Sequence, residues 1–271
     1  MGRDYTPITE VPGIGADKDQ LARLYHRYHL ASRYCTGKRA LEVACGPGIG
    51  LGYLARTASF IVGGDLTASL VRTVYRHYQS RVPVLQMDAH ALPFREGSFD
   101  TVILFEALYY LANPRTFLDE CRRVLVPDGT LVLSTVNKEW ADFSPSMFST
   151  EYLSARELSE LLGQSGFDSE LFAAFPIRTG SAIETVVSLM KRTAVAARLM
   201  PRSMRAKQLL RRMFFGKLSP LPSELQAGWE EKTPTVPITL DGAVSDYKIL
   251  YAVAHPRTGE PETRREDSAR R

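Results

Sequence analysis

Three glycines in the stretch RALEVACGPGIG, at positions 46, 48 and 50, follow an apolar run that carries one acid. A strand that ends in a glycine loop and leads into a helix favours an anion or a nucleotide, because free backbone N–H groups and the helix dipole point at the ligand. A phosphate-binding loop requires a Lys after the glycines, and this chain has none there. The dinucleotide pattern GxGxxG lacks its third glycine, which is Leu51 counted from Gly46 and Tyr53 counted from Gly48. An NAD-type oxidoreductase is therefore the weaker alternative.

Three acids lie at the ends of three successive candidate strands. Glu42 comes four residues before the first glycine of the loop, Asp65 ends the second strand and Asp88 ends the third. The carboxyl ends of parallel strands meet at one edge of a sheet, where an acid is well placed to accept both hydroxyls of an adenosine ribose. The three acids suit a ligand with hydroxyls, an exocyclic amine and a cation rather than one with phosphates.

The elements that must position these residues alternate between strand and helix. Apolar runs bounded by turns predict strands at 38–44, 59–65, 82–88, 98–106, 129–137, 168–177 and 246–256, the fifth entered from the turn PDG. Apolar residues at helical spacing predict helices at 17–31, 50–58, 67–79, 114–125 and 154–167. Asp17, Thr67 and Ser154 are the expected N-caps, and Gly166 marks the end of the last helix. The alternation predicts an α/β fold with a doubly wound, mostly parallel, seven-stranded sheet.

We expect one core domain with additions at both of its ends. Residues 1–37 are predicted to be a helical cap over the ligand, and residues 38–178 the ligand-binding α/β core. A basic, largely helical lid at 179–243 precedes the final core strand at 244–255. Residues 256–271 contain no large apolar residue, so we expect a disordered tail.

Positive charge is concentrated in residues 181–217. Nine Lys or Arg and one acid, Glu184, give this segment a charge of +8, whereas the whole chain totals +4. Apolar residues alternate with the cations, which is typical of a lid over an active site or of an element that contacts an anionic membrane surface. We expect the lid, and leave open peripheral membrane contact and a lipid-like or anionic acceptor. Aromatic residues for base stacking are sparse here, which disfavours nucleic acid as a partner.

The cysteines and the amino terminus bear on the compartment. Cys35, Cys45 and Cys121 fit neither a disulfide framework nor the close spacing of a zinc site, so we expect no metal and a reducing compartment. Neither an apolar signal-peptide core nor a run of about 18 apolar residues occurs in the sequence. The expected location is the cytoplasm, with a peripheral place at a membrane surface left open.

In combination these motifs resemble the class I S-adenosylmethionine-dependent methyltransferases, in the small-molecule, methyltransferase-11-like branch. LEVACGPG at 41–48 resembles the first motif of that family and FDTVILFEALYYL at 99–111 the fourth. The resemblance covers roughly residues 20–175 and the last strand. It implies S-adenosylmethionine as cofactor and S-adenosylhomocysteine as product.

The resemblance also implies roles for individual residues around the cofactor. The backbone around Ala44, Gly46 and Gly48 would lie against the methionine part, with Glu42 supporting it. The remaining implied contacts are Asp65 on the ribose diol, Leu66 on adenine, Asp88 and Ala89 on the adenine amine and ring, Phe105 near the methionine end, and Tyr28 from the closing helix. Ala44 stands where the family most often has Gly, an exchange that is tolerated if the residue keeps a negative φ.

A sulfonium is already an activated leaving group, so the cofactor dictates no catalytic residue. Candidates are Glu106, Tyr109 and, on the leading helix, His29, although Tyr109 is equally well explained by packing. The sequence LFEALYY replaces the D/N-P-P-Y/F signature of enzymes that methylate amines of DNA bases or protein glutamine, which disfavours that chemistry. The expected function is O-, N- or C-methylation of a small metabolite or natural product. A cofactor-binding module without transfer activity is the alternative.

Overall fold

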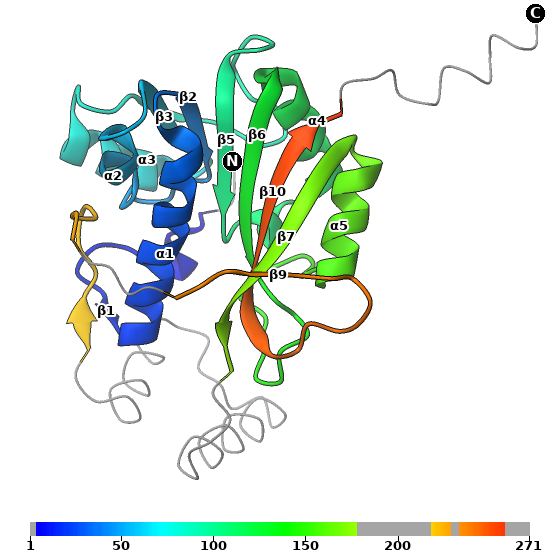
Figure 1. Cartoon of the computed structure of the whole chain (residues 1–271). Coiled ribbons are helices and arrows are strands. Elements are labelled where there is room, and N and C mark those ends of the chain that lie inside the picture. The colour runs from blue at the N-terminus through cyan, green and yellow to red at the C-terminus, as the bar shows by residue number, and fades with distance from the viewer. Residues whose placement is uncertain (1–3, 178–217, 229–232, 258–271) are drawn as a thin grey trace, which may run out of the picture.

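A computed structural model describes residues 4–177, 218–228 and 233–257 (Figure 1). The basic segment 181–217 and residues 258–271 lie outside these ranges. The predictions of a helical lid and a disordered tail therefore stay predictions.

An eight-stranded sheet in the order β4-β3-β2-β5-β6-β10-β7-β9 forms the centre of the molecule. Its strands are β2 (Arg39–Val43), β3 (Phe60–Asp65), β4 (Val84–Gln86), β5 (Phe99–Phe105), β6 (Leu125–Val136), β7 (Phe167–Pro176), β9 (Val236–Pro237) and β10 (Tyr247–Pro256). The first five of these pair in parallel, and β10 runs antiparallel to both β6 and β7. The α/β, mostly parallel fold is confirmed. Seven strands were predicted for this sheet. The eighth is β9, a two-residue strand at the edge beyond β7.

The strand order reverses at β2, the first strand of the predicted core. β3, the next strand in the chain, pairs on one side of β2, and β5 pairs on the other. In open α/β sheets, ligands bind outside the carboxyl ends of the strands at such a reversal. The residues that follow β2, β3 and β5 are thus brought to one place.

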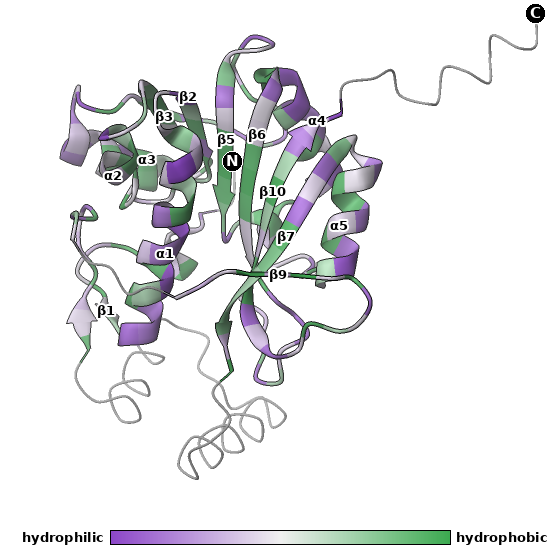
Figure 2. Cartoon of the chain, in the orientation of Figure 1, coloured by the Kyte–Doolittle hydropathy of each residue, from purple (hydrophilic) through white to green (hydrophobic). Residues whose placement is uncertain are grey.

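Helices cover both faces of the sheet (Figure 1). α1 (Lys18–Cys35), α2 (Leu51–Ala55) and α3 (Ala68–Tyr78) lie on one face, and α4 (Pro114–Val124) and α5 (Ala155–Gln164) on the other. Side chains alternate along a strand, so Leu41 and Val43 pack toward α4 and α5, whereas Ala40 packs toward α1. Figure 2 shows the resulting apolar centre of the sheet.

The helix ends agree with most of the predicted signals. The Asp17 side chain accepts a hydrogen bond from the Gln20 N–H at 2.8 Å, and Ser154 forms a capping box at the start of α5. Gly166 follows α5 with a φ of +77°. Thr67 is the residue before α3, but its side chain does not cap the helix; its hydroxyl accepts the N–H of Tyr5.

Two predicted features of the core differ in detail. The PDG sequence lies within β6 rather than in a turn before it, and the extra residues are absorbed by a shift in register between β5 and β6. The helix predicted at 50–58 is shorter in the structure, where α2 begins at Leu51 and ends at Ala55.

The segment before α1 is attached to residues near 220. β1 (Gly15–Ala16) pairs antiparallel with β8 (Ser219–Pro220) in a separate two-stranded sheet. Within the described residues, no helix is long and apolar enough to cross a membrane.

Candidate active site

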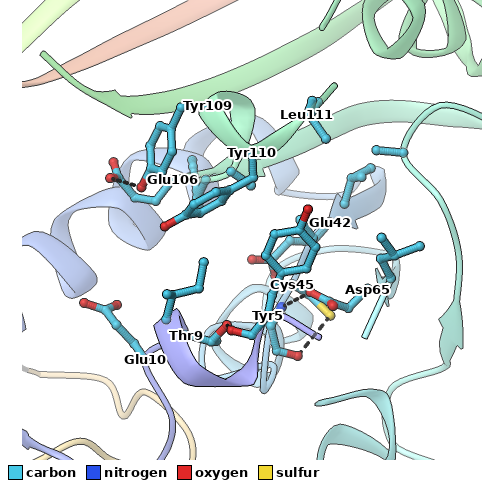
Figure 3. A pocket seen from close by; sticks show the side chains of 18 of the residues that line it. Tyr5, Thr9, Glu10, Glu42, Cys45, Asp65, Glu106, Tyr109, Tyr110 and Leu111 are labelled. Atoms are coloured by element: carbon cyan, nitrogen blue, oxygen red, sulfur yellow. Dashed lines mark hydrogen bonds between the residues drawn. The ribbon is translucent and has the colours of Figure 1, made fainter. Parts of the chain in front are cut away.

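A cavity of about 580 Å³ lies at the carboxyl edge of the sheet, where the strand order reverses. It is enclosed by residues 5–10, one face of α1, the glycine loop, the ends of β3, β4 and β5, and the 3-10 helix Leu108–Tyr110 (Figure 3). The predicted site residues that line it are Tyr28, Glu42, Ala44, Gly46, Asp65, Leu66, Asp88, Ala89, Phe105, Glu106 and Tyr109. Eleven of the thirteen predicted residues are thus brought together.

The glycine loop turns sharply through left-handed backbone. Ala44, Gly46 and Gly48 have φ values of +54°, +57° and +73°. The negative φ on which tolerance of Ala44 in place of Gly depended is therefore absent. The loop must reverse direction directly after β2, and Ala44 takes a conformation that favours glycine.

We predict that Ala44→Gly raises the free energy of unfolding by about 0.5–1 kcal/mol. Relief of the left-handed strain contributes about 1–2 kcal/mol, and the greater entropy of glycine in the unfolded chain offsets part of it. Urea denaturation measures the change. Ala40→Gly, within β2 itself, is the control and should lower the free energy of unfolding. A loss of stability in both variants would contradict the strain at Ala44.

Glu42 is buried beneath the loop with one oxygen unused. The Tyr28 hydroxyl donates to Glu42 Oε1 at 2.6 Å, whereas Oε2 has no hydrogen-bond partner in the described protein. Burial raises the pKa of Glu42 to about 7. Gly50 makes room for this pair, because a Cβ at that position would overlap the Tyr28 ring.

The raised pKa of Glu42 predicts a pH dependence of stability. Between pH 4.5 and about 7 the folded protein keeps a proton that the unfolded chain has lost, so stability falls as the pH rises through this window. The shift of about 2.5 pH units corresponds to about 3 kcal/mol. Glu42→Gln should therefore gain about 3 kcal/mol relative to wild type between pH 4 and pH 8, measured by urea denaturation. Parallel pH curves for the two proteins would contradict the shift.

Asp65 ties the end of β3 to the glycine loop. Its Oδ2 accepts the Gly46 N–H at 2.9 Å and its Oδ1 accepts the Thr67 N–H at 2.8 Å. Burial raises the pKa of Asp65, and these two bonds act in the opposite direction. The carboxylate therefore stands at a defined place beside the loop, as Figure 3 shows.

Asp88 is more exposed and is held by His90. His90 Nδ1 lies 2.7 Å from Asp88 Oδ1, and the Asn113 N–H donates to His90 Nε2. The proton of a neutral His90 ring is thereby placed on Nδ1, where it donates to Asp88. His90 positions the carboxylate, and this bond helps to lower the pKa of Asp88.

Glu106, directly after β5, is half-buried and has left-handed backbone with a φ of +52°. The Tyr109 hydroxyl donates to Glu106 Oε2 at 3.2 Å, and the Ser134 hydroxyl donates to Oε1 at 3.3 Å. Burial raises the pKa of Glu106, although Arg27 and Arg23 oppose the shift. A carboxylate with a raised pKa inside a cavity is suited to accept a proton.

The face of α1 toward the cavity carries polar residues that were not among the predicted site residues. Gln20, Arg23 and Arg27 line the cavity, and Glu10 pairs with Arg27 at 2.9 Å and accepts from Gln20 at 2.7 Å. The spacing of 20, 23 and 27 places these three on one helix face. That spacing was visible in the sequence, but the contribution of Glu10 from outside the helix was not.

Two predicted site residues lie elsewhere. His29 is exposed on α1, with Nδ1 3.3 Å from the Tyr53 hydroxyl, and it does not line the cavity. A catalytic role for His29 therefore has no support from its position. Gly48 lies against α3 and does not line the cavity. A Cβ at this position would lie 2.8 Å from Val74, and the Gly48 carbonyl accepts a hydrogen bond from the Tyr78 hydroxyl.

Part of the core is similar to known proteins. Residues 41–133 match the family described as "Methyltransferase domain". A probable S-adenosylmethionine-dependent methyltransferase of Mycolicibacterium smegmatis is 32% identical over 166 residues, 59% of this chain and 63% of that protein. A ubiquinone biosynthesis O-methyltransferase of Xanthomonas oryzae is 33% identical over 121 residues, 43% of this chain and 51% of that protein. The YcgJ protein of Bacillus subtilis has a similar fold, with a TM-score of 0.57 at 16% identity over 87% of this chain and all of that one.

Residues 41–133 thus match a methyltransferase domain, and the fold around them is similar to that of the YcgJ protein. The expected α/β fold is confirmed, and the match and the curated relatives agree with the expected family and with S-adenosylmethionine as the expected cofactor. The chain spans less than two thirds of either curated relative.

The cavity suits this cofactor on two grounds of its own. The unused Oε2 of Glu42 is a buried acceptor that matches an ammonium group, such as that of the methionine part. Asp65, anchored by two backbone donors, presents a carboxylate beside apolar Leu66 and Met87, which matches a ribose next to an adenine.

Proposed function

We propose that this protein transfers the methyl group of S-adenosylmethionine to a small-molecule acceptor. The observation that carries the proposal is the meeting of Glu42, Asp65 and Asp88 in one cavity at the reversal of strand order. A methyl donor of this kind has a cation, two hydroxyls and an exocyclic amine, which are the groups that three carboxylates recognise. The predicted cofactor contacts that line the cavity are part of the proposal.

The proposed roles divide the cavity into two ends. When bound, the cofactor supplies a methyl group on a positively charged sulfur. Glu42, held by Tyr28, would hold the amino group, and Asp65 would hold the ribose hydroxyls. At the other end, Glu106 would accept the proton of the acceptor, with Tyr109 orienting its carboxylate.

The alternatives make distinct predictions. An NAD-type oxidoreductase would bind NAD, and a module without transfer activity would bind S-adenosylhomocysteine and form no methylated product. The similarity to a methyltransferase domain favours transfer over both. A cytoplasmic location and peripheral membrane contact through residues 181–217 remain proposals from composition and charge.

The test is a labelling experiment with the full chain. The protein is incubated with methyl-labelled S-adenosylmethionine and fractionated metabolite extract from the source cells, and labelled products are identified by mass spectrometry. We expect label in at least one small molecule and none with the Asp65→Ala variant. Binding of S-adenosylhomocysteine without any labelled product would favour the non-catalytic module instead.

A further inference from the structure

The end of the cavity next to α1 contains two guanidinium groups with unused donors. Five buried side-chain nitrogen or oxygen atoms of the described residues have no hydrogen-bond partner, and three of them, Arg23 Nε, Arg27 Nε and Glu42 Oε2, belong to residues that line the cavity. A buried donor left without an acceptor costs about 1–3 kcal/mol. The two Nε–H groups therefore define a place for a hydrogen-bond acceptor from outside the protein.

Each arginine is held in position by an acid, and in neither does Nε form a hydrogen bond within the described residues. Arg27 donates through a terminal nitrogen to Glu10, and Glu10 is held in turn by Gln20. Arg23 Nε lies 3.5 Å from Asp19, too long for a good hydrogen bond, and Asp19 also pairs with Lys248 at 3.2 Å. The arginines are thus preorganised before any ligand binds.

Glu106 lies near both arginines without touching them. Both guanidinium groups lower the pKa of Glu106, yet neither forms an ion pair with it in the described part of the chain. Figure 3 shows Glu106 and Glu10 on one side of the cavity and Asp65 on the other. The cluster of arginines and acids is therefore separate from the end proposed for the ribose.

We propose that Arg23 and Arg27 form an oxyanion subsite that takes the acidic hydroxyl of a phenol or enol acceptor, with its oxygen between their Nε–H groups and Glu106. This inference rests on the proposed function and names its substrate class. The rings of Tyr5 and Tyr110, with centroids 5.6 Å apart, and the ring of Tyr109 supply flat walls for the rest of a planar acceptor.

The charges at this end favour a hydroxyl over a permanently charged anion. Three cations, Arg23, Arg27 and Lys248, face four carboxyl groups, those of Asp19, Glu10, Glu106 and Glu42, so no positive charge is in surplus. A carboxylate or phosphate would add uncompensated negative charge. A hydroxyl adds none, because its proton passes to Glu106 as its oxygen becomes negative.

The chemical step balances with these groups. The acceptor oxygen forms a bond to the methyl carbon while the bond from that carbon to sulfur breaks, and the electron pair of the broken bond stays on sulfur. The hydroxyl proton goes to a carboxyl oxygen of Glu106. Arg23 and Arg27 stabilise the negative oxygen by charge-assisted hydrogen bonds before it is methylated.

The test uses 4-nitrophenol, whose ionised form is coloured, with full-length protein saturated with S-adenosylhomocysteine. Absorbance is followed as a function of pH for free and bound probe. We expect the bound phenol to ionise about tenfold more readily than the free one, a downward shift of about one pH unit. Arg23→Gln and Arg27→Gln should each remove most of the shift. Arg33→Gln, on the exposed side of the same helix, is the matched control and should keep it.

Several outcomes would overturn the inference. They are the absence of phenol binding, binding without a shift, and a shift that both cavity variants retain. Arg23 is partly exposed, so its variant remains informative if Arg27→Gln fails to fold. Calorimetry with S-adenosylhomocysteine on the same samples separates the two failures. Binding of S-adenosylhomocysteine without a phenol shift contradicts only this inference, whereas the absence of S-adenosylhomocysteine binding contradicts the proposed function.

Discussion

Asp65→Ala should weaken the binding of S-adenosylhomocysteine by at least a hundredfold. The carboxylate would accept both ribose hydroxyls, and a hydrogen bond to a charged group contributes about 1.5–3 kcal/mol. Two such bonds correspond to about 3–6 kcal/mol, or roughly two to four orders of magnitude in Kd. The substitution also releases the N–H groups of Gly46 and Thr67, so the loop loses its attachment to β3.

A matched control separates this effect from a general loss of stability. Asp100→Ala removes a carboxylate that accepts three hydrogen bonds from Arg39 and does not line the cavity. We expect that variant to bind S-adenosylhomocysteine as tightly as the wild type in calorimetric titration. Equal affinity of the Asp65→Ala variant and the wild type would remove Asp65 from the cofactor site.

Glu106→Gln should lower the rate of methyl transfer by about two to four orders of magnitude, the usual contribution of a general base. The affinity for S-adenosylhomocysteine should stay within about twofold, because the proposed cofactor contacts are made by other residues. Single-turnover rates with a saturating acceptor measure the effect. Glu120→Gln, which alters an acid paired with Arg123 outside the cavity, is the control. An unchanged rate in the Glu106 variant would exclude it as the base.

The pH dependence of the rate of methyl transfer is a second test of Glu106 as the base. A base acts only when deprotonated, so transfer should fall as the pH drops through the pKa of Glu106. Because burial raises that pKa, the fall should begin at a higher pH than for an exposed glutamate. Tyr109→Phe removes a hydrogen bond that stabilises the charged carboxylate and should move the fall to still higher pH. An identical profile in that variant would leave Tyr109 with a packing role.

The core and the cofactor end could be predicted from local sequence signals. Parallel strands read as continuous apolar runs, and an acid at the end of such a run lies at the same sheet edge as the others. Glu42, Asp65 and Asp88 therefore meet as expected, although they are separated by more than twenty residues from one to the next. The capping box at Ser154 followed from side-chain chemistry alone.

The acceptor end could not be predicted in the same way. The Glu10–Arg27 pair joins a loop to a helix, and no local pattern specifies such a contact. His29 and Arg27 are two residues apart on α1, and only the rotation of the helix against the sheet decides that Arg27 faces the cavity. The left-handed backbone of Ala44 and Glu106 could not be predicted either, since neither residue type favours a positive φ.

The most direct test of the proposed cofactor site is calorimetric titration of the wild-type chain with S-adenosylhomocysteine and, separately, with NAD. We expect one binding site per chain for S-adenosylhomocysteine and no heat of binding for NAD. Binding of NAD, or no binding of S-adenosylhomocysteine, would contradict the proposed site.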